Sequence, residues 1–405
     1  MLEDYDLYDV IIVGGGASGL LCALECARDG MDVLVLEKDQ QPARKILVSG
    51  NGRCNLTNRH VSPAYYQADP ALINAALSHF SFEDCCRYFE SLGVLLHEEG
   101  LGRVFPAANK SSAVSEALKT ALKEAGAEIK CATEVISIRA AAAQFMVTTQ
   151  AKDVYHAHNV VLACGSCAYP QVTGTKRGYE LAQSLGHTII SPVPTLSGLC
   201  LKERALTRLS GVKCQVRTTL KNDPSVQSEG ELIFTNYGVN GPAALNISGV
   251  VSRALQNGPV PVEINFFPQL KDPQAFLDER LEKLGHRKPK DFFIGLLHEG
   301  IINLLIDFMG MRKNMPMNTQ NFQRPWQTLL AWPVTVTALR PWQEAMAAAG
   351  GVKTDEINYN TFESRLHPGL FITGELLDVD GKSGGLNLHF AWASGYTAAQ
   401  AIKEK

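Results

Sequence analysis

The residues best suited to chemistry in this chain are glycines near the amino terminus, spaced to hold the phosphates of a dinucleotide. They follow an apolar run over residues 8–13, and an apolar helical pattern follows them. A buried strand that turns sharply into a helix needs glycine for the turn, for approach of a pyrophosphate and for helix–strand packing. The helix amino end then offers free N–H groups to the phosphates. The expected cradle comprises Gly14, Gly15, Gly16, Ala17, Ser18 and Gly19.

A carboxylate follows this loop at the distance typical of a ribose contact. Residues 33–36 are expected to form the next buried strand, and Glu37 comes 18 residues after Gly19. At that place a carboxylate accepts hydrogen bonds from both hydroxyls of an adenosine ribose, and its charge argues against a 2′-phosphate there. A lone glycine motif is weak, but strand, helix, strand and acid at the expected spacing together predict a dinucleotide site.

Cysteines offer a second kind of chemistry. Cys164 and Cys167 form a C-x-x-C pair, which is the spacing of redox dithiols and of half a metal site. The chain has no second such pair for a tetrahedral metal, and the strand expected over 160–163 gives the following turn another use. We therefore expect no metal site and favour packing over a redox role, which stays open. Ten cysteines in 405 residues do not indicate a disulfide framework.

The composition is that of an ordinary soluble protein. A chain of 405 residues, 45% hydrophobic and 20% charged, buries a large core and should form two or three domains. Its net charge of −3 argues against binding nucleic acid over the whole surface and leaves a local basic patch open. The acidic residues 1–6 lack a signal-peptide pattern, and polar residues interrupt the most apolar stretch, 294–311. We expect no membrane segment and a cytoplasmic location.

The periodicity of apolar residues predicts two kinds of region, one of alternating helices and strands and one rich in strands. Toward both chain ends helices alternate with buried strands. In the amino-terminal part we expect a helix over 111–123, a parallel strand over 128–135, a hairpin of 145–149 with 154–156 and a buried strand over 159–163. In the carboxyl-terminal part we expect a strand over 370–375, a loop over 378–385 and a helix from 388. From about 196 the pattern changes to period-two strands over 214–220, 231–234, 260–267 and 334–339. Within this region residues 272–330 are expected to be helical, with a start at Asp272-Pro273 and an apolar face over 291–309.

The fold class that follows is α/β. A Rossmann-like domain is expected to be built from both chain ends, residues 1–195 and 346–405. A β-rich substrate domain, residues 196–270 and 331–345, is expected to be inserted into it and to carry a small helical subdomain, residues 271–330.

The carboxyl-terminal segment favours FAD over NAD as the dinucleotide. The two share adenosine and pyrophosphate, but a flavin needs additional protein to hold its ribitol and ring. A late strand, a glycine loop and a helix start supply backbone N–H groups for this purpose. A helix amino end at the flavin pyrimidine stabilises the negative charge that collects there on reduction. The expected flavin contacts are Gly374, Glu375, Gly385, Leu386, Asn387 and Leu388.

Motifs along the whole chain resemble one bacterial flavoprotein family. They are RKILVSG at 44–50, GRCNLTN at 52–58, GRVFP at 102–106, GGV at 350–352, PGLFITGELLDVDG at 368–381 and GGLNL at 384–388. The chain resembles the BaiN-like or aminoacetone-oxidase-type NAD(P)/FAD-dependent oxidoreductases of the glutathione-reductase-like FAD superfamily. The resemblance implies an FAD-binding domain, an inserted β domain and a small helical domain.

The resemblance also implies positions around the cofactor. Glu37 and Lys38 would lie by the adenosine, Val135 would hold the adenine, and the turn Ala163-Cys164-Gly165 would pack over the nucleotide. The motif residues expected to contact the cofactor are Arg44, Lys45, Ser49, Gly50 and Asn55. The chain departs from the family pattern at Cys164-Gly165-Ser166, where threonine-glycine-glycine is usual, and at Asn236, where a histidine is usual.

Four residues are candidates for positioning and for the proton transfer that accompanies hydride transfer at a flavin. For Cys54 a packing role is expected more than an acid role, because thiol acidity needs a partner. Arg53 better suits anchoring a phosphate or carboxylate, since a guanidinium stays protonated. His389 could take the role of the family histidine that Asn236 replaces, and Thr354 is the fourth candidate.

The electron donor and the substrate stay open at the level of sequence. Only one G-x-G-x-x-G is present, so NAD(P)H would have to enter the substrate cleft transiently, or electrons would pass to oxygen. The resemblance suggests, for some members, reduction of a uridine of 23S ribosomal RNA to dihydrouridine. The alternatives are a small molecule, either an amine or an unsaturated ring, and a non-catalytic FAD-containing binding factor.

A basic patch on the helical subdomain favours RNA, although a solvated helix face explains it equally well. Its members are Lys283, His286, Arg287, Lys288, Lys290, Arg312 and Lys313.

Overall fold

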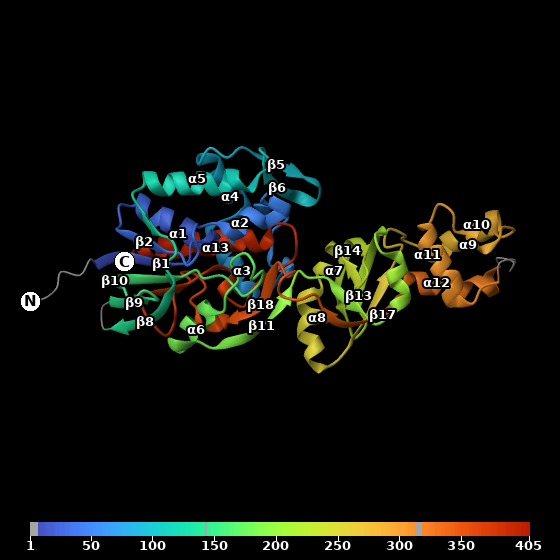
Figure 1. Ribbon diagram of the computed structural model, residues 1–405. Coiled ribbons are helices and arrows are strands. Elements are labelled where there is room, and N and C mark those ends of the chain that lie inside the picture. The colour runs from blue at the N-terminus through green and yellow to red at the C-terminus, as the bar shows by residue number, and fades with distance from the viewer. Residues whose placement is uncertain (1–6, 142–143, 313–317) are drawn as a thin grey trace, which may run out of the picture. The chain divides into compact units, whose positions relative to one another are not determined.

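The chain forms two compact units, one of residues 1–193 with 347–405 and the other of residues 194–346 (Figure 1). In the computed structural model the described residues are 7–141, 144–312 and 318–405. The first unit is built from both chain ends and the second is a continuous insertion, so the predicted α/β fold class with a separate β-rich region is confirmed. The predicted three-part division, with a helical subdomain bounded at 271 and 330, stays a prediction.

A seven-stranded mixed sheet forms the centre of the first unit, in the order β7-β2-β1-β10-β9-β8, with β19 paired to β10. Five strands of this sheet run in the same direction: β1 (Leu7–Val13), β2 (Val33–Leu36), β7 (Glu128–Lys130), β10 (Val154–Leu162) and β19 (Leu370–Ile372). β1 pairs with β2 and β10, β2 pairs with β7, and β10 pairs with β19. The strands β8 (Val135–Ala141) and β9 (Gln144–Thr149) add antiparallel pairs at one side. A parallel sheet is covered on both faces, which explains the unbroken apolar runs of β1 and β2.

Two predictions about these strands are wrong in extent. The single parallel strand expected over 128–135 is divided, because β7 ends at Lys130 and β8 begins at Val135 with an antiparallel partner. The hairpin strand and the buried strand expected over 154–163 are one strand, β10. One edge of β10 pairs with β1, and along the other edge its first half pairs with β9 and its second half with β19.

Helices α1 (Ala17–Arg28) and α13 (Leu386–Lys403) lie against each other in the first unit (Figure 1). Cys22 and Cys26 are buried within α1. A β-carbon on Gly395 of α13 would lie only 2.2 Å from the Ser18 carbonyl oxygen. Glycine is therefore required for the two helices to come this close. The helix α5 (Ser111–Glu124) also contacts α1, and it confirms the helix predicted over 111–123.

Smaller elements of the first unit surround this core. They are α2 (Arg44–Val48), β3 (Thr57–Asn58), β4 (Tyr66–Gln67), α3 (Pro70–His79), α4 (Phe82–Ser91), β5 (Leu96–Glu99), β6 (Arg103–Pro106), α6 (Arg177–Ser184) and β20 (Asp380–Gly381). The strands β3, β6 and β5 form one small sheet, and β20 pairs with β4. The chain leaves the first unit along β11 (Ile189–Thr195) and returns along β18 (Ala347–Val352), which pair with each other.

The second unit contains a closed barrel in the order β12-β15-β14-β13-β16-β17. Its strands are β12 (Leu199–Leu201), β13 (Lys213–Leu220), β14 (Asp223–Phe234), β15 (Gly238–Asn240), β16 (Val260–Asn265) and β17 (Trp332–Leu339). Burial alternates along β13 and β16, because successive side chains point to opposite faces of a strand. The period-two signal in the sequence therefore corresponds to the inside and outside of the barrel.

Helices complete the second unit: α7 (Pro242–Leu245), α8 (Ser248–Ala254), α9 (Pro273–Leu284), α10 (Pro289–Phe292), α11 (Glu299–Met309) and α12 (Thr319–Leu330). The Asp272 side chain accepts a hydrogen bond from the Ala275 N–H, which confirms the predicted helix start. The apolar face predicted over 291–309 is divided between α10 and α11, with Gly295 between them in a left-handed conformation. Among the described residues, no helix is both long and apolar enough to cross a membrane.

The contact between α13 and α1 predicts the effect of one added methyl group. Gly395→Ala should lower the free energy of unfolding by about 1–3 kcal/mol, because the methyl group would press on the Ser18 carbonyl. In an open helix the same change would stabilise by about 1 kcal/mol. Denaturant unfolding followed by circular dichroism measures the difference. Gly100→Ala is the control, since its β-carbon meets open space; a variant at 395 as stable as the wild type contradicts the close contact.

Candidate active site

The glycine loop joins β1 to α1 with no room for a β-carbon at Gly14, Gly15 or Gly19. Gly14 has φ 109°, and a β-carbon on it would lie 2.5 Å from the Ala163 carbonyl oxygen. A β-carbon on Gly19 would lie 2.1 Å from the Gly14 oxygen. Gly16 is the N-cap of α1 and supplies no side-chain cap. The first N–H groups of α1 are thus available to an anionic ligand.

Glu37 directly follows the last residue of β2, and its side chain contacts the glycine loop. The residue is 7% exposed. One carboxylate oxygen accepts from the Gly15 N–H at 2.7 Å and the other from the Asp39 N–H at 2.8 Å. Burial raises the pKa of Glu37, and these two N–H donors oppose that rise. Each carboxylate oxygen can accept a second bond, so the group retains capacity for ribose hydroxyls.

Asp39 connects two predicted cofactor residues. Its Oδ1 lies 3.1 Å from the Lys38 Nζ and 3.2 Å from an Arg44 guanidinium nitrogen. Its Oδ2 is buried and has no hydrogen-bond partner among the described residues. An unpartnered buried carboxylate oxygen beside two cations is a polar position that a ligand can complete.

The C-x-x-C turn follows β10 and its two thiols have different surroundings. The Cys164 sulfur lies 3.4 Å from the Val13 carbonyl oxygen. Burial raises the pKa of this thiol to about 12. A β-carbon on Gly178 of α6 would lie 2.6 Å from the Cys164 β-carbon. The charged groups that act on Cys167 are instead Lys176, Glu375 and Lys45. Cys164 therefore packs between β1 and α6, as expected for a packing role of this turn.

Other predicted nucleotide contacts lie near this turn. Ala163 is buried and its carbonyl oxygen faces Gly14. Val135 is buried at the first residue of β8. The described residues contain no group of three His, Cys, Asp or Glu side chains placed to hold a metal ion.

The 44–58 segment adopts an unusual backbone. Gly50, Asn51, Gly52 and Cys54 all have positive φ, and a β-carbon on Gly50 would lie 2.6 Å from the Asn55 nitrogen. Positive φ is rare for a residue other than glycine and marks strain that its surroundings hold in place. Cys54 is fully buried, and burial raises the pKa of its thiol to about 12. The sulfur is therefore protonated at neutral pH.

Arg53 binds a carboxylate of the protein itself. Its guanidinium forms an ion pair with Glu99, donates to the Asn109 side chain at 2.7 and 3.1 Å, and lies 4.1 Å from the centre of the Phe105 ring. His97 Nε2 is 3.2 Å from the same Glu99 carboxylate. Arg53 thus joins the 44–58 segment to β5 and β6. Glu99 could not be predicted from the sequence, because nothing in the local pattern links it to a residue 46 positions earlier.

The carboxyl-terminal segment meets the same region. Glu375 forms an ion pair with Lys45 through one carboxylate oxygen and accepts from the Ala348 N–H at 3.1 Å through the other. Thr373, just before it, has a buried hydroxyl with no partner among the described residues. A β-carbon on Gly374 would lie 2.7 Å from the Ser18 hydroxyl at the start of α1. The structure therefore brings the predicted residues of both chain ends together.

The start of α13 is a second helix amino end without a side-chain cap. Gly385 is its N-cap with φ 98°, and a β-carbon there would lie 2.7 Å from the Thr57 oxygen and 2.9 Å from Asn55 Oδ1. That Asn55 oxygen is buried and unpartnered within the described part of the chain. Asn387 fixes the preceding loop, since its side chain bonds both the N–H and the carbonyl of Gly381 at 2.8 Å. Leu386 is buried beside it and Leu388 is half-buried.

His389 is fully buried one turn into α13. Its Nδ1 is 2.7 Å from the Thr57 hydroxyl, and its Nε2 is 3.1 Å from the Phe80 carbonyl oxygen. Burial lowers the pKa of His389 to about 4, so the ring is neutral at pH 7. The carbonyl requires a donor, which places the proton on Nε2 and leaves Nδ1 to accept from Thr57. Thr354 is half-exposed at the start of a short turn, 354–356, and is not part of this buried group.

Two residues inside the GRCNLTN motif were not named as site residues. Thr57 holds the His389 ring. Asn58 donates to the Gly384 carbonyl at 2.9 Å and accepts from the His60 N–H at 2.9 Å. Both tie the motif to the start of α13, and their place in a motif already singled out was the available signal.

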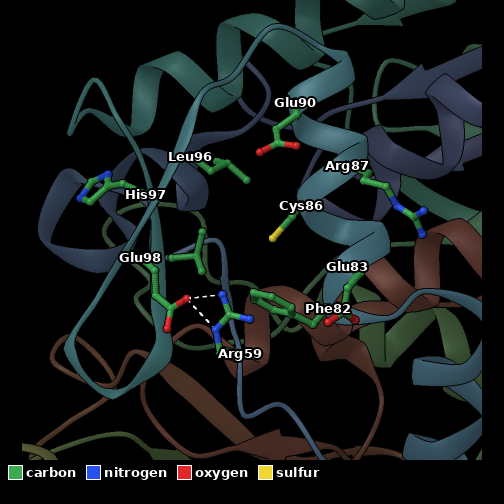
Figure 2. A pocket seen from close by; sticks show the side chains of 10 residues that line it. Arg59, Phe82, Glu83, Cys86, Arg87, Glu90, Leu96, His97 and Glu98 are labelled. Carbon is green, nitrogen blue, oxygen red and sulfur yellow. Dashed lines mark hydrogen bonds and ion pairs between the residues drawn. The ribbon is translucent and has the colours of Figure 1, made fainter.

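Figure 2 shows a groove of about 540 Å³ beside this region, between α4 and the strands β5 and β6. Cys86 and Glu90 on α4 face Leu96 on β5 across it, and the ion pair of Arg59 with Glu98 lies at one end. Burial raises the pKa of the Cys86 thiol to about 11. None of the predicted cofactor or catalytic residues lines this groove.

A dinucleotide carrying a flavin fits the residues present. Two uncapped helix amino ends, at α1 and α13, offer N–H groups to anionic groups. The glycine positions leave no side chain in the way, and the unpartnered atoms Asp39 Oδ2, Asn55 Oδ1 and Thr373 Oγ1 can be completed by a polar ligand. The fold and this set of donors define a flavoprotein with a Rossmann-type domain.

The chain belongs to the HI0933-like family, because residues 8–401 match the family described as HI0933-like protein Rossmann domain. It is 32% identical to the 3-dehydro-bile acid delta(4,6)-reductase of Clostridium scindens, over 97% of this chain and 98% of the relative. It is 30% identical to the ribosomal RNA dihydrouridine synthase of Haemophilus influenzae, over 98% of each chain. The protein is an FAD-dependent oxidoreductase, and the family expected from the motifs is confirmed.

Solved structures show the same fold at low sequence identity. The 3-ketosteroid delta1-dehydrogenase of Sterolibacterium denitrificans, in complex with 1,4-androstadiene-3,17-dione, is similar with a TM-score of 0.53 and 15% identity. The similarity covers 98% of this chain and 100% of that one. At this identity the comparison supports the flavoenzyme fold alone.

The Gly385 geometry predicts a loss of cofactor. Gly385→Ala should weaken FAD binding by about tenfold or more, since a clash of roughly 1–3 kcal/mol at the start of α13 displaces its N–H groups. FAD content per protein, measured by flavin absorbance after gel filtration, tests this. Gly126→Ala is the matched control, because Gly126 also has a positive φ, of 83°, but open space around its β-carbon position. Equal FAD content in both variants would refute the proposed place of the α13 amino end.

The buried His389 predicts a pH dependence. Its folded pKa, about 4, lies below the unfolded value of about 6.5, so the unfolded chain binds a proton first as the pH falls. Its contribution to stability is complete above pH 6.5 and is lost between about pH 6.5 and 4, at about 1.4 kcal/mol per pH unit and about 3 kcal/mol in all. His389→Gln should remove this part of the pH dependence. Denaturant unfolding of both proteins across that range is the measurement, and parallel curves would contradict a neutral buried ring.

Proposed function

We propose that the protein reduces a carbon–carbon double bond conjugated to a carbonyl, and that its substrate is a uridine of ribosomal RNA. The names of the two relatives describe a delta(4,6)-reductase and a dihydrouridine synthase. Dihydrouridine is uridine with the bond between C5 and C6 saturated, and that bond is conjugated to the C4 carbonyl. Hydride addition to such a bond is chemistry that a flavin can carry. Both relatives therefore support one reaction type on substrates of very different size.

The distribution of charge along the chain favours RNA over a small uncharged molecule as the substrate. Residues 194–346 hold 17 Lys and Arg against 13 Asp and Glu, a net charge of +4. The remaining residues hold 21 Lys and Arg against 28 Asp and Glu, a net charge of −7. The overall charge of −3 thus conceals a positive second unit. A polyanion is attracted to such a surface, whereas a small uncharged ring needs no such field.

The residues of the chain are proposed to divide the work as follows. When bound, FAD supplies the hydride for the double bond. The N–H groups at the starts of α1 and α13 are proposed to hold its pyrophosphate and its pyrimidine, with Glu37 on the ribose and Val135 at the adenine. Further proposed contacts are Lys38, Arg44, Lys45, Ser49, Gly50, Asn55, Ala163, Cys164, Gly165, Gly374, Glu375, Asn387 and Leu388.

The second carbon of the double bond needs a proton, and Cys54 and Thr354 are the proposed donors. The Cys54 thiol carries a proton at neutral pH, but burial raises its pKa to about 12 and so makes it a weak acid, which keeps the packing role ahead of the donor role. Arg53 and His389 are proposed to be positioning residues. Arg53 forms an ion pair with Glu99, and His389 accepts a hydrogen bond from the Thr57 hydroxyl. Each fixes the backbone on one side of Cys54.

NAD(P)H is the proposed electron donor, and the cytoplasm is the proposed place of reaction. The chain has one glycine-rich dinucleotide motif, so the nicotinamide is proposed to use the substrate side of the flavin and to leave before RNA binds. A second candidate substrate is an unsaturated ring of steroid type, which the relative with 32% identity favours.

Nucleoside mass spectrometry of ribosomal RNA tests the proposed function. A strain lacking the gene should lose dihydrouridine, and the wild-type gene should restore it. A Gly14→Ala/Gly16→Ala gene should fail to restore it, since a β-carbon on Gly14 would collide with Ala163 and one on Gly16 would stand in the way of the pyrophosphate. The control is Gly30→Ala, a glycine with open space around its β-carbon position. Unchanged dihydrouridine in the deletion strain would refute the RNA substrate and favour the ring-shaped small molecule.

A further inference from the structure

The positive charge of the second unit lies in one short stretch. Residues 280–290 hold five Lys and Arg and one Glu, whereas the rest of residues 194–346 holds twelve residues of each sign. The net charge of +4 is therefore the charge of these eleven residues. They cover the end of α9, the turn after it and the start of α10 (Figure 1).

Two of the five cations are already paired. Lys283 forms an ion pair with Glu279, one turn earlier on α9. Lys290 lies 2.5 Å from a carboxylate oxygen of Glu299, at the start of α11. Exposed pairs contribute little to stability, but each places a negative charge beside its cation. The basic patch predicted from the sequence is therefore smaller than it looked, and Lys313 lies outside the described residues.

Arg280 is held by carbonyl oxygens instead. Its guanidinium donates to the Phe292 oxygen at 2.6 and 3.1 Å and to the Ile294 oxygen at 2.9 Å. It also lies 5.3 Å from the centre of the Phe292 ring. Burial lowers the pKa of Arg280, and the positive charge of Arg287 lowers it further. Arg280 is thus fixed near the end of α9 by carbonyl oxygens, which do not neutralise its charge.

Arg287 and Lys288 continue this group into the exposed turn. Both side chains are exposed, and neither forms a hydrogen bond or ion pair with the residues that the structure describes. A forked guanidinium and an ammonium, both exposed in the turn that follows the helix carrying a fixed guanidinium, are suited to the oxygens of a phosphodiester. The acidic residues nearest in sequence, Glu282 and Asp291, are also exposed and leave the stretch positive overall.

We propose that Arg280, Arg287 and Lys288 form a binding site for the phosphodiester backbone of the RNA substrate. The proposal rests on the proposed function, which supplies the RNA. Contacts to phosphate position a nucleic acid without reading its bases. The turn after α9 thus orients RNA, while the choice of uridine belongs to other residues.

Salt dependence of RNA binding tests this site. The FAD-loaded protein is titrated against a fluorescein-labelled RNA stem-loop with an unpaired uridine, by fluorescence anisotropy at several salt concentrations. Arg287→Ala/Lys288→Ala should bind about tenfold more weakly at low salt and lower the slope of log Kd against log salt by about 2. Lys283→Ala/Lys290→Ala removes the same charge from the same stretch, but from paired lysines, and should leave the slope nearly unchanged. FAD content and thermal unfolding should be equal in all three proteins.

The outcomes separate this proposal from the proposed function. If the wild type binds the RNA and both double variants behave alike, the site is refuted and the RNA substrate stands. If the wild type shows no salt-dependent binding and dihydrouridine is unchanged in the deletion strain, both are refuted. A loss confined to the Arg287 and Lys288 variant supports the site.

Discussion

In the first unit, backbones approach one another so closely that no side chain fits between them, and this constraint fixes the nucleotide site. A β-carbon on Gly14 would lie 2.5 Å from the Ala163 oxygen, and one on Gly395 would lie 2.2 Å from the Ser18 oxygen. Because protein interiors are close-packed, such contacts hold β1, α1 and α13 in one arrangement. The uncapped starts of α1 and α13 then stand at fixed positions, and the donors they offer need no side chain to aim them.

The elements with local signals could be predicted from the sequence. The apolar run of β1, the first helix and β2 were expected, and α5 was expected within one residue of its end. Strand pairing was harder, because partners of a strand are chosen by distant segments. The run 128–135 reads as one strand, but only β7 pairs with β2, and Val135 begins a strand that pairs with β9. The alternating pattern showed the strands of the second unit, while their closure into a barrel depends on pairs far apart in sequence.

The site could be predicted to the level of its backbone but not of its side-chain partners. Glycine spacing and the acid after β2 are sequence signals with a direct physical cause. The partner of Lys45 lies 330 positions later, and the partner of His389 lies 332 positions earlier. No periodic or spacing rule links residues so distant, so the ion pair with Glu375 and the bond with Thr57 required the structure. The same limit applies to Arg53 and Glu99, where a cation expected to meet a ligand meets a carboxylate of its own chain.

The division of the first unit between the two chain ends sets an order for folding during synthesis. Residues 194–346 are continuous, so the barrel has all its strands once β17 has left the ribosome. The first unit must wait longer, since β19 and α13 lie in the last 59 residues of the chain. Until then the face of α1 that later meets α13 has no cover. The second unit can thus be complete while the first still lacks β19 and α13, and we expect FAD to bind only after the end of the chain has been made.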